Sequence, residues 1–239
     1  MQVQANQNII VLSTRNVREG AEKALSAFAQ QAGLTDCIVM SSDSASSLAL
    51  ETRCPNTRSI GELRRTANNV QIDVNIVSAH IRRKKLLLAD MDATIIQGES
   101  LDELADLAGI ADKITPITKR AMAGELDFED ALTARLNLLT GQPETLLDQV
   151  VNNTKITNGA NEVVATMRNH GARCYLVSGG FNFLTGAIAK QLGFNDHHSN
   201  IMGTADGLLT GKAVPPILDQ QAKLKFLKYY IQKFNLTPN

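Results

Sequence analysis

The sequence Lys85-Leu-Leu-Leu-Ala-Asp-Met-Asp-Ala-Thr-Ile-Ile-Gln-Gly-Glu99 joins an apolar segment to a closely spaced pair of acidic residues. The run from Leu86 to Ala89 is typical of a strand that is buried on both faces of a parallel sheet. Asp90 and Asp92 follow at its carboxyl end, where open α/β sheets bind their ligands. Buried carboxylates need a cation or hydrogen bonds, so the pattern indicates a chemical site. An Asp-rich turn or helix cap is an equal alternative for such a short motif.

The composition is that of an ordinary globular chain with no excess of either charge. Of 239 residues, 44% are apolar and 20% are charged, and 24 basic side chains balance 24 acidic ones. This length suggests one large domain or two smaller ones. The balanced charge gives no indication of nucleic-acid binding. No apolar run approaches the roughly 18 residues that a membrane span requires.

The cysteines and the amino terminus bear on location. Cys37, Cys54 and Cys174 form an odd set without metal-ligand spacing. Cys174 falls in an apparent core strand, where a free thiol behaves as a small hydrophobe. The opening residues MQVQANQN are polar and lack the apolar segment of a signal peptide. We therefore expect a reduced protein in the cytoplasm.

Residues 1–80 are predicted to form a small unit of their own. The patterns indicate strands over 8–13, 37–40, 47–52 and 70–77, a helix over 17–32 and a short helix capped by Ser59. The order β-α-β-β-α-β is that of a ferredoxin-like unit, and regulatory amino-acid-binding ACT domains are similar to it. Because no ligand motif is visible, we favour a packing or dimerisation module over a ligand sensor, which leaves homodimer formation open.

The rest of the chain alternates helical and strand patterns. Helices are predicted over 101–108, 116–123, 127–139, from Pro143 onward, over 161–169 and over 223–233. A second buried strand, 173–181, ends in Ser178-Gly179-Gly180. Glycines between a strand and a helix let backbone N–H groups approach a phosphate closely, and the helix amino terminus adds favourable charge. This signal is weak when taken alone.

Four segments together resemble the haloacid dehalogenase superfamily of phosphatases, and within it the phosphoserine phosphatase branch. They are D-x-D-x-T at 90–94 followed by Glu99, ITKRAMAGELDFEDALTARLNLL at 117–139, the turn at 178–180, and DGLLTGKAVPPILDQQAK at 206–223. The resemblance implies an α/β fold with a Rossmann-like core, in which helices cover both faces of a parallel sheet. It also implies a small helical cap at about 97–155. The domains would be a ferredoxin-like domain at 1–80 and a phosphatase domain at 81–239.

The same resemblance implies a phosphoryl-transfer site at the strand ends. Asp90 would be the nucleophile that forms an aspartyl-phosphate, and Asp92 would protonate the leaving oxygen and then activate water. Mg²⁺ would bind the Asp90 side chain and the Asp92 main-chain carbonyl, because that ion prefers hard oxygen ligands. Ser178, the Gly179 amide and Lys223 would hold the phosphoryl oxygens. On spacing alone, an ordinary solvated helical lysine would be preferred for Lys223.

The cap resemblance implies the substrate, O-phospho-L-serine, which would be hydrolysed to L-serine and phosphate. Glu99 and Arg135 would bind the serine end, since a carboxylate can pair with an ammonium group and a guanidinium can grip a carboxylate. Met122 and Phe128 would wall the pocket. Without the resemblance, a surface ion pair with Glu129 or Asp130 would be the preferred interpretation of Arg135. His197 and His198 lack a third metal ligand and are predicted to lie in a loop.

Two features depart from the family pattern. Ala93 stands where close relatives usually have serine, which alters no catalytic group. The fourth motif, G-D-x-x-N-D, supplies a further metal carboxylate in the family and is absent before Asn239. We therefore expect a truncated chain with missing strands and an unpaired sheet edge. The alternatives are a related small-molecule phosphatase or phosphotransferase, or an inactive binding protein.

Overall fold

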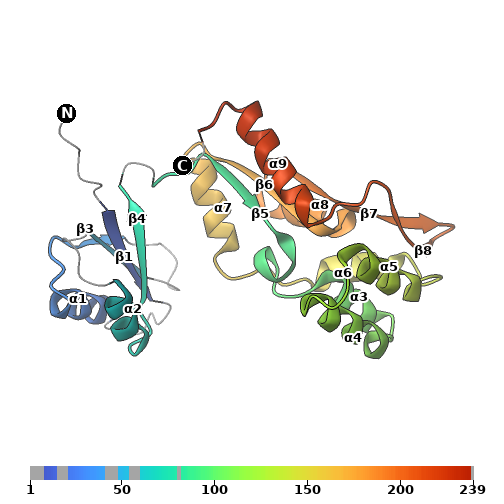
Figure 1. The fold of residues 1–239 in the computed structure, drawn as a ribbon, viewed down its shortest axis with the longest axis horizontal. Coiled ribbons are helices and arrows are strands. Elements are labelled where there is room, and N and C mark those ends of the chain that lie inside the picture. Colours follow the sequence, from blue (N-terminus) through green and yellow to red (C-terminus); the bar gives the residue numbers. More distant parts are fainter. Residues whose placement is uncertain (1–7, 15–20, 41–47, 54–59, 80–81, 238–239) are drawn as a thin grey trace. The chain divides into compact units, whose positions relative to one another are not determined.

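A computed structural model describes residues 8–14, 21–40, 48–53, 60–79 and 82–237 (Figure 1). The chain divides into two compact units, Met1–Arg82 and Arg83–Asn239. We describe each unit by itself. Among the described residues, no helix is both long and apolar enough to cross a membrane.

The first unit is an antiparallel sheet with two helices. Its elements are β1 (Asn8–Thr14), α1 (Ala21–Gln31), β2 (Ile38–Met40), β3 (Leu48–Arg53), α2 (Ile60–Asn68) and β4 (Asp73–Ser78). The sheet order is β2-β3-β1-β4, with every neighbour antiparallel. Leu12 and Leu50 of the sheet and Leu25 and Phe28 of α1 share one core. The element order agrees with the sequence prediction, while the Ser59 cap lies outside the described residues.

The last strand of this unit begins later than the sequence predicted. The alternation from Val70 to Val77 indicated one strand, but β4 starts at Asp73. Gln71 adopts a φ of 57°, in the left-handed region that strands do not use. Val70 is 55% exposed, so its side chain gains little from extending the sheet.

The second unit contains a mostly parallel sheet. Its strands are β5 (Leu86–Ala89), β6 (Arg173–Phe181), β7 (Asp196–Ala205) and β8 (Leu208–Val214), in the order β5-β6-β7-β8. β5, β6 and β7 are parallel, and β8 pairs with β7 as an antiparallel hairpin. The hairpin turns at Asp206 and Gly207, whose positive φ values of 51° and 75° suit a tight turn of two residues.

Helices cover both faces of this sheet, as the sequence predicted. They are α7 (Ala160–Asn169), α8 (Asn182–Leu192) and α9 (Gln220–Lys233). Cys174 and Leu176 of β6 pack in a core with side chains of α7 and α8. Tyr175 and Val177, the alternate residues of the same strand, pack against Tyr230 of α9. Because successive side chains of a strand point to opposite faces, the two helix groups lie on opposite sides.

Four helices between β5 and α7 form the cap. They are α3 (Ser100–Leu107), α4 (Ala111–Met122), α5 (Phe128–Leu138) and α6 (Thr145–Asn153), and Figure 1 shows them gathered together. The prediction that the second helix starts at Pro116 was wrong, because α4 begins at Ala111 and carries Pro116 in its interior. The side chain of Ile114 is fully buried in the core, and this burial offsets the cost of an interior proline.

Two further details of the sheet bear on the sequence predictions. Within the described residues, β5 is an edge strand, paired only with β6. The loop prediction for the two histidines was wrong, since both lie in β7. His197 contacts Thr185 of α8, whereas His198 contacts Tyr230 of α9. The two rings therefore stabilise opposite faces of the sheet.

Candidate active site

The acidic pair lies where β5 ends and the chain turns sharply into the cap. Asp90 keeps an extended backbone and accepts a hydrogen bond from the Met91 N–H at 2.9 Å. The following turn (η1, Met91–Ile95) is irregular, since Ala93 has a φ of 49° and ψ of 14°. The Ala93 N–H donates to the Gly98 carbonyl at 2.9 Å. This turn holds Asp90 and Asp92 at the carboxyl end of the sheet.

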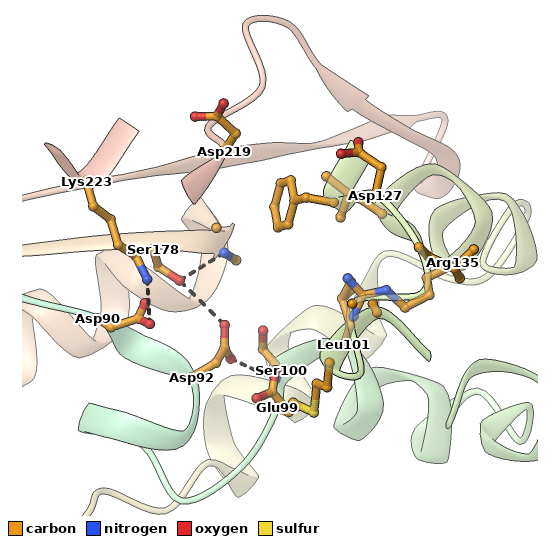
Figure 2. Close-up of a pocket in the computed structure, with 18 of the residues that line it drawn as sticks. Asp90, Asp92, Glu99, Ser100, Leu101, Asp127, Arg135, Ser178, Asp219 and Lys223 are labelled. Carbon is orange, nitrogen blue, oxygen red and sulfur yellow. Dashed lines mark hydrogen bonds and ion pairs between the residues drawn. The ribbon is translucent and has the colours of Figure 1, made fainter. Parts of the chain in front are cut away.

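Asp90 forms an ion pair with a lysine that is distant in the sequence. The Nζ of Lys223 donates to the Oδ2 of Asp90 at 2.6 Å (Figure 2). Lys223 lies in the first turn of α9, whose amino terminus is capped by Asp219 through the Ala222 N–H. Both side chains of the pair stay partly exposed, at 41% and 38%. Lys223 is therefore not a simple solvated lysine of the helix surface.

Asp92 is the more enclosed carboxylate. Its Oδ1 accepts a hydrogen bond from the Ser100 N–H at 2.8 Å, and its Oδ2 lies 3.5 Å from the Oγ of Ser178. Burial raises the pKa of Asp92, and the nearby charge of Asp90 adds to this effect, while the hydrogen bonds oppose it. A carboxyl group of this kind retains a proton at higher pH than a solvated aspartate does.

The turn at the end of β6 needs its glycines for close packing. Ser178 is buried, and its Oγ accepts a hydrogen bond from the Gly180 N–H at 2.9 Å. A Cβ atom at Gly180 would lie 2.8 Å from the Oδ2 of Asp92, and one at Gly179 would lie 3.1 Å from the ring of Phe128. Any larger residue at these positions would displace either the carboxylate or the wall of the cavity.

A cavity of about 880 Å³ lies between the sheet end and the cap. Every site residue that the sequence predicted lines it: Asp90, Asp92, Glu99, Met122, Phe128, Arg135, Ser178, Gly179 and Lys223. Figure 2 shows the Asp90, Asp92, Ser178 and Lys223 side chains on the sheet side, with Arg135 and Asp127 on the cap side. The structure thus brings the two predicted groups of residues to one cavity.

Burial shifts the pKa of both charged groups on the cap side, Glu99 and Arg135. Burial, together with the nearby charges of Asp92 and Asp102, raises the pKa of Glu99 to about 7, and the charge of Arg135 opposes this shift. Burial lowers the pKa of Arg135, and Asp102, Glu99 and Asp92 counteract this effect. The Arg135 Nε donates to the Ala131 carbonyl at 3.2 Å. Within the described residues, no ion pair joins Arg135 to Glu129 or Asp130.

Comparison with known proteins identifies the family of this chain. The haloacid dehalogenase-like hydrolase family matches residues 87–237. The chain belongs to the haloacid dehalogenase-like hydrolase family. It is 34% identical over 178 residues to a phosphoserine phosphatase of Archaeoglobus fulgidus, an alignment that covers 74% of this chain and 52% of that protein.

Solved structures agree with this membership. A haloacid dehalogenase family hydrolase from Salmonella enterica superposes with a TM-score of 0.80 at 24% identity, covering 97% of this chain and 80% of that one. A phospho-aspartyl intermediate analogue of phosphoserine phosphatase superposes with a TM-score of 0.61 at 33% identity, covering 65% and 74%. The chain spans about half the length of the curated relatives that it matches.

Several residues of the candidate site escaped the sequence analysis. Ser100 is buried and its N–H holds Asp92, and Asp219 caps the helix of Lys223. The fully buried Asn200 donates to the Gly179 carbonyl at 2.8 Å and accepts from the Leu218 N–H at 2.7 Å. Residues 195–199, which precede Asn200, are all polar, so no sequence signal singled it out. In the described part of the chain, no cluster of three or more acidic, histidine or cysteine side chains could hold a metal ion.

Proposed function

We propose that this chain carries the catalytic site of a Mg²⁺-dependent phosphoserine phosphatase. The reaction would hydrolyse O-phospho-L-serine to L-serine and phosphate through an aspartyl-phosphate. The contact of 2.6 Å between Lys223 Nζ and Asp90 Oδ2 carries the proposal, because it sets a cation beside a carboxylate at the floor of the cavity. The names of the relatives support this substrate, and the chain spans about half of their length.

The first chemical step uses the two aspartates together. A carboxylate oxygen of Asp90 attacks phosphorus, and the bond from phosphorus to the serine oxygen breaks. Asp92 gives its proton to that leaving oxygen, a role that suits a carboxyl group with a raised pKa. The products of this step are L-serine and an acyl phosphate on Asp90.

The second step reverses the role of Asp92. Its carboxylate takes a proton from a water molecule as the water oxygen attacks phosphorus. The acyl phosphate bond breaks, which restores Asp90 and releases phosphate. Ser178, the Gly179 N–H and Lys223 stabilise the phosphoryl oxygens during both steps, since positioned donors act where negative charge develops.

The donor set of the sheet side fits a Mg²⁺ ion. Asp90 and Asp92 supply hard oxygen ligands, and Mg²⁺ is usually bound through one or two carboxylates together with waters and substrate phosphates. We propose the Asp90 side chain and the Asp92 main-chain carbonyl as the protein ligands. The bound ion would neutralise charge on the phosphoryl group.

The cap side would select the serine end of the substrate. Arg135 would bind the carboxylate with its forked guanidinium donors, and Glu99 would bind the ammonium group. Met122 and Phe128 would form apolar walls, a role supported by the packing of Phe128 against Gly179.

The test is Mg²⁺-dependent phosphate release from O-phospho-L-serine by this 239-residue chain, with Asp90→Asn as the control. We expect release that the variant abolishes. Faster release from phosphothreonine or a sugar phosphate would favour the related phosphatase instead. Substrate binding without release would favour an inactive binding protein.

We further propose that residues 1–80 form a ferredoxin-like, ACT-like domain and residues 81–239 the phosphatase domain. The sheet order β2-β3-β1-β4 and the two helices of the first unit support the first assignment. A homodimer and a cytoplasmic location stay predictions. Sedimentation of the chain at several concentrations tests the homodimer.

A further inference from the structure

Three cap helices meet at a hydroxyl group directly behind Arg135. Thr118 of α4 is only 4% exposed, and its Oγ1 donates a hydrogen bond to the Oδ1 of Asp102 in α3 at 2.8 Å. The Nη1 of Arg135 in α5 lies 3.5 Å from the same Oγ1. One buried oxygen thus links an acidic side chain of one helix to a basic side chain of another.

The direction of these hydrogen bonds follows from the chemistry of the groups. A threonine hydroxyl has one hydrogen to donate. A carboxylate can only accept hydrogen bonds, and a guanidinium can only donate them. Donation to Asp102 therefore turns the lone pairs of Thr118 Oγ1 toward Arg135. A hydroxyl that donates to a charged acceptor also becomes a better acceptor itself.

Arg135 is consequently held at two of its nitrogens. Its Nε donates to the Ala131 carbonyl of its own helix at 3.2 Å, and its Nη1 faces Thr118. In the part of the chain that the structure describes, no hydrogen bond reaches Nη2. The guanidinium lines the cavity, so the uncommitted donors are available to a ligand there (Figure 2).

We propose that Thr118 and Asp102 are positioning residues that fix the direction of the Arg135 guanidinium, and so make the cavity selective for phosphate esters that carry a carboxylate. This inference rests on the proposed function. Preorganising a planar donor group lowers the entropy lost when a ligand binds. A bond that merely joins α3 to α4 would affect folding without affecting the choice of substrate.

The experiment compares O-phospho-L-serine with O-phosphoethanolamine, which keeps the phosphate ester and the ammonium group but lacks the carboxylate. The measured quantity is kcat/KM for O-phospho-L-serine divided by kcat/KM for O-phosphoethanolamine. We expect Thr118→Val to lower this ratio about tenfold through loss of one charge-assisted contact. Thr118→Ser keeps the hydroxyl and should stay within about twofold of the wild type.

Two further variants separate positioning from folding. Thr185 of α8 is a fully buried threonine on the far side of the sheet from α9, bonded to Ser199. Thr185→Val therefore controls for the loss of a buried hydroxyl and should leave the ratio unchanged. Asp102→Asn keeps an acceptor for Thr118 but removes the charge, and should lower the ratio about threefold. If Thr118→Val does not fold, the ratio measured for Asp102→Asn tests the positioning role.

A second measurement does not depend on turnover. In the NMR spectrum of the unliganded chain, the Nε–H signal of Arg135 should be sharp in the wild type. The same signal should be broadened or averaged in Thr118→Val. If the wild-type chain releases no phosphate but this change occurs, the proposed function fails and the positioning role stands. An unchanged resonance, or an equal loss of kcat/KM for both compounds in Thr118→Val, overturns the positioning role.

Discussion

The two sides of the cavity differ in how their charged groups are held. On the sheet side, Asp90 is paired with Lys223, and Asp92 is bonded to the Ser100 N–H. On the cap side, Glu99 makes no side-chain capping bond to its own helix, and among the described residues Arg135 is held only by neutral oxygens. The sheet side therefore resembles a preset reaction centre, whereas the cap side keeps its charges available for a ligand. This difference predicts that sheet-side variants lose chemistry and cap-side variants lose selectivity.

The largest effect is expected at Asp90. Asp90→Asn removes the attacking oxygen while keeping the shape of the side chain, so turnover of phosphoserine should fall by more than about 10³-fold. Asp148→Asn, in an exposed turn of α6, is the matched control. Circular dichroism should show both variants folded. Retention of activity in Asp90→Asn would remove this residue from the nucleophile role.

The next largest effect is expected at Lys223. Lys223→Met keeps the length of the side chain and removes the charge that faces Asp90, so kcat should fall about 10²- to 10³-fold. Steady-state kinetics on phosphoserine and phosphoethanolamine should show the same loss for both. Lys225→Met changes an exposed lysine of the same helix and should be neutral. Equal losses in the two variants would indicate damage to α9 instead.

Arg135 tests the cap side. Arg135→Met should lower kcat/KM for phosphoserine about 10- to 100-fold, because a charge-assisted pair with the substrate carboxylate is lost. Phosphoethanolamine should change by less than about threefold, since it offers no carboxylate. Arg120→Met removes an exposed pair with Glu125 and serves as the control. A similar loss for both compounds would contradict the assignment of Arg135 to the carboxylate.

The smallest effect is expected in stability at Glu99. Its pKa is about 7 in the folded chain, against an ordinary 4.5, so the folded state holds the proton more tightly than the unfolded state does. Stability from this group is full below about pH 4.5 and is lost as pH rises toward 7. Glu99→Gln should therefore stabilise the chain by about 1 kcal/mol at pH 8, after allowance for the solvent exposure of this half-buried group. Urea unfolding at pH 5 and pH 8 measures the difference in free energy of unfolding between Glu99→Gln and the wild type. This difference should be smaller at pH 5.

The sequence predicted the parts of the fold that local patterns determine. The apolar runs of β5 and β6 marked the sheet, and the periodic helices of the cap were found in order. The start of α4 was missed because the tertiary burial of Ile114 outweighs the local effect of Pro116. The histidine pair was missed because partners on two different helices, Thr185 and Tyr230, make a polar segment a stable strand.

In the candidate site, too, the sequence predicted some residues and missed those that depend on tertiary contacts. The short acidic motif marked Asp90 and the family resemblance marked Lys223, and the contact between them spans 133 positions of sequence. The supporting contacts of Asn200 and Thr118 use ordinary residues, and only the folded chain reveals their partners. The roles of the predicted residues await the measurements above, although the structure brings all of them to one cavity.

The aromatic stack beneath α9 gives the chain an optical property of its own. The protein has no tryptophan and three tyrosines, all of which lie in the second unit. The rings of Tyr175 in β6 and Tyr230 in α9 stack with centroids 3.7 Å apart. Tyrosine emission therefore reports on the packing of α9 against the sheet, without a label and without a tyrosine signal from the first unit. Because α9 also carries Lys223, stopped-flow recording of this signal can time any movement of that helix when a phosphate ester is added.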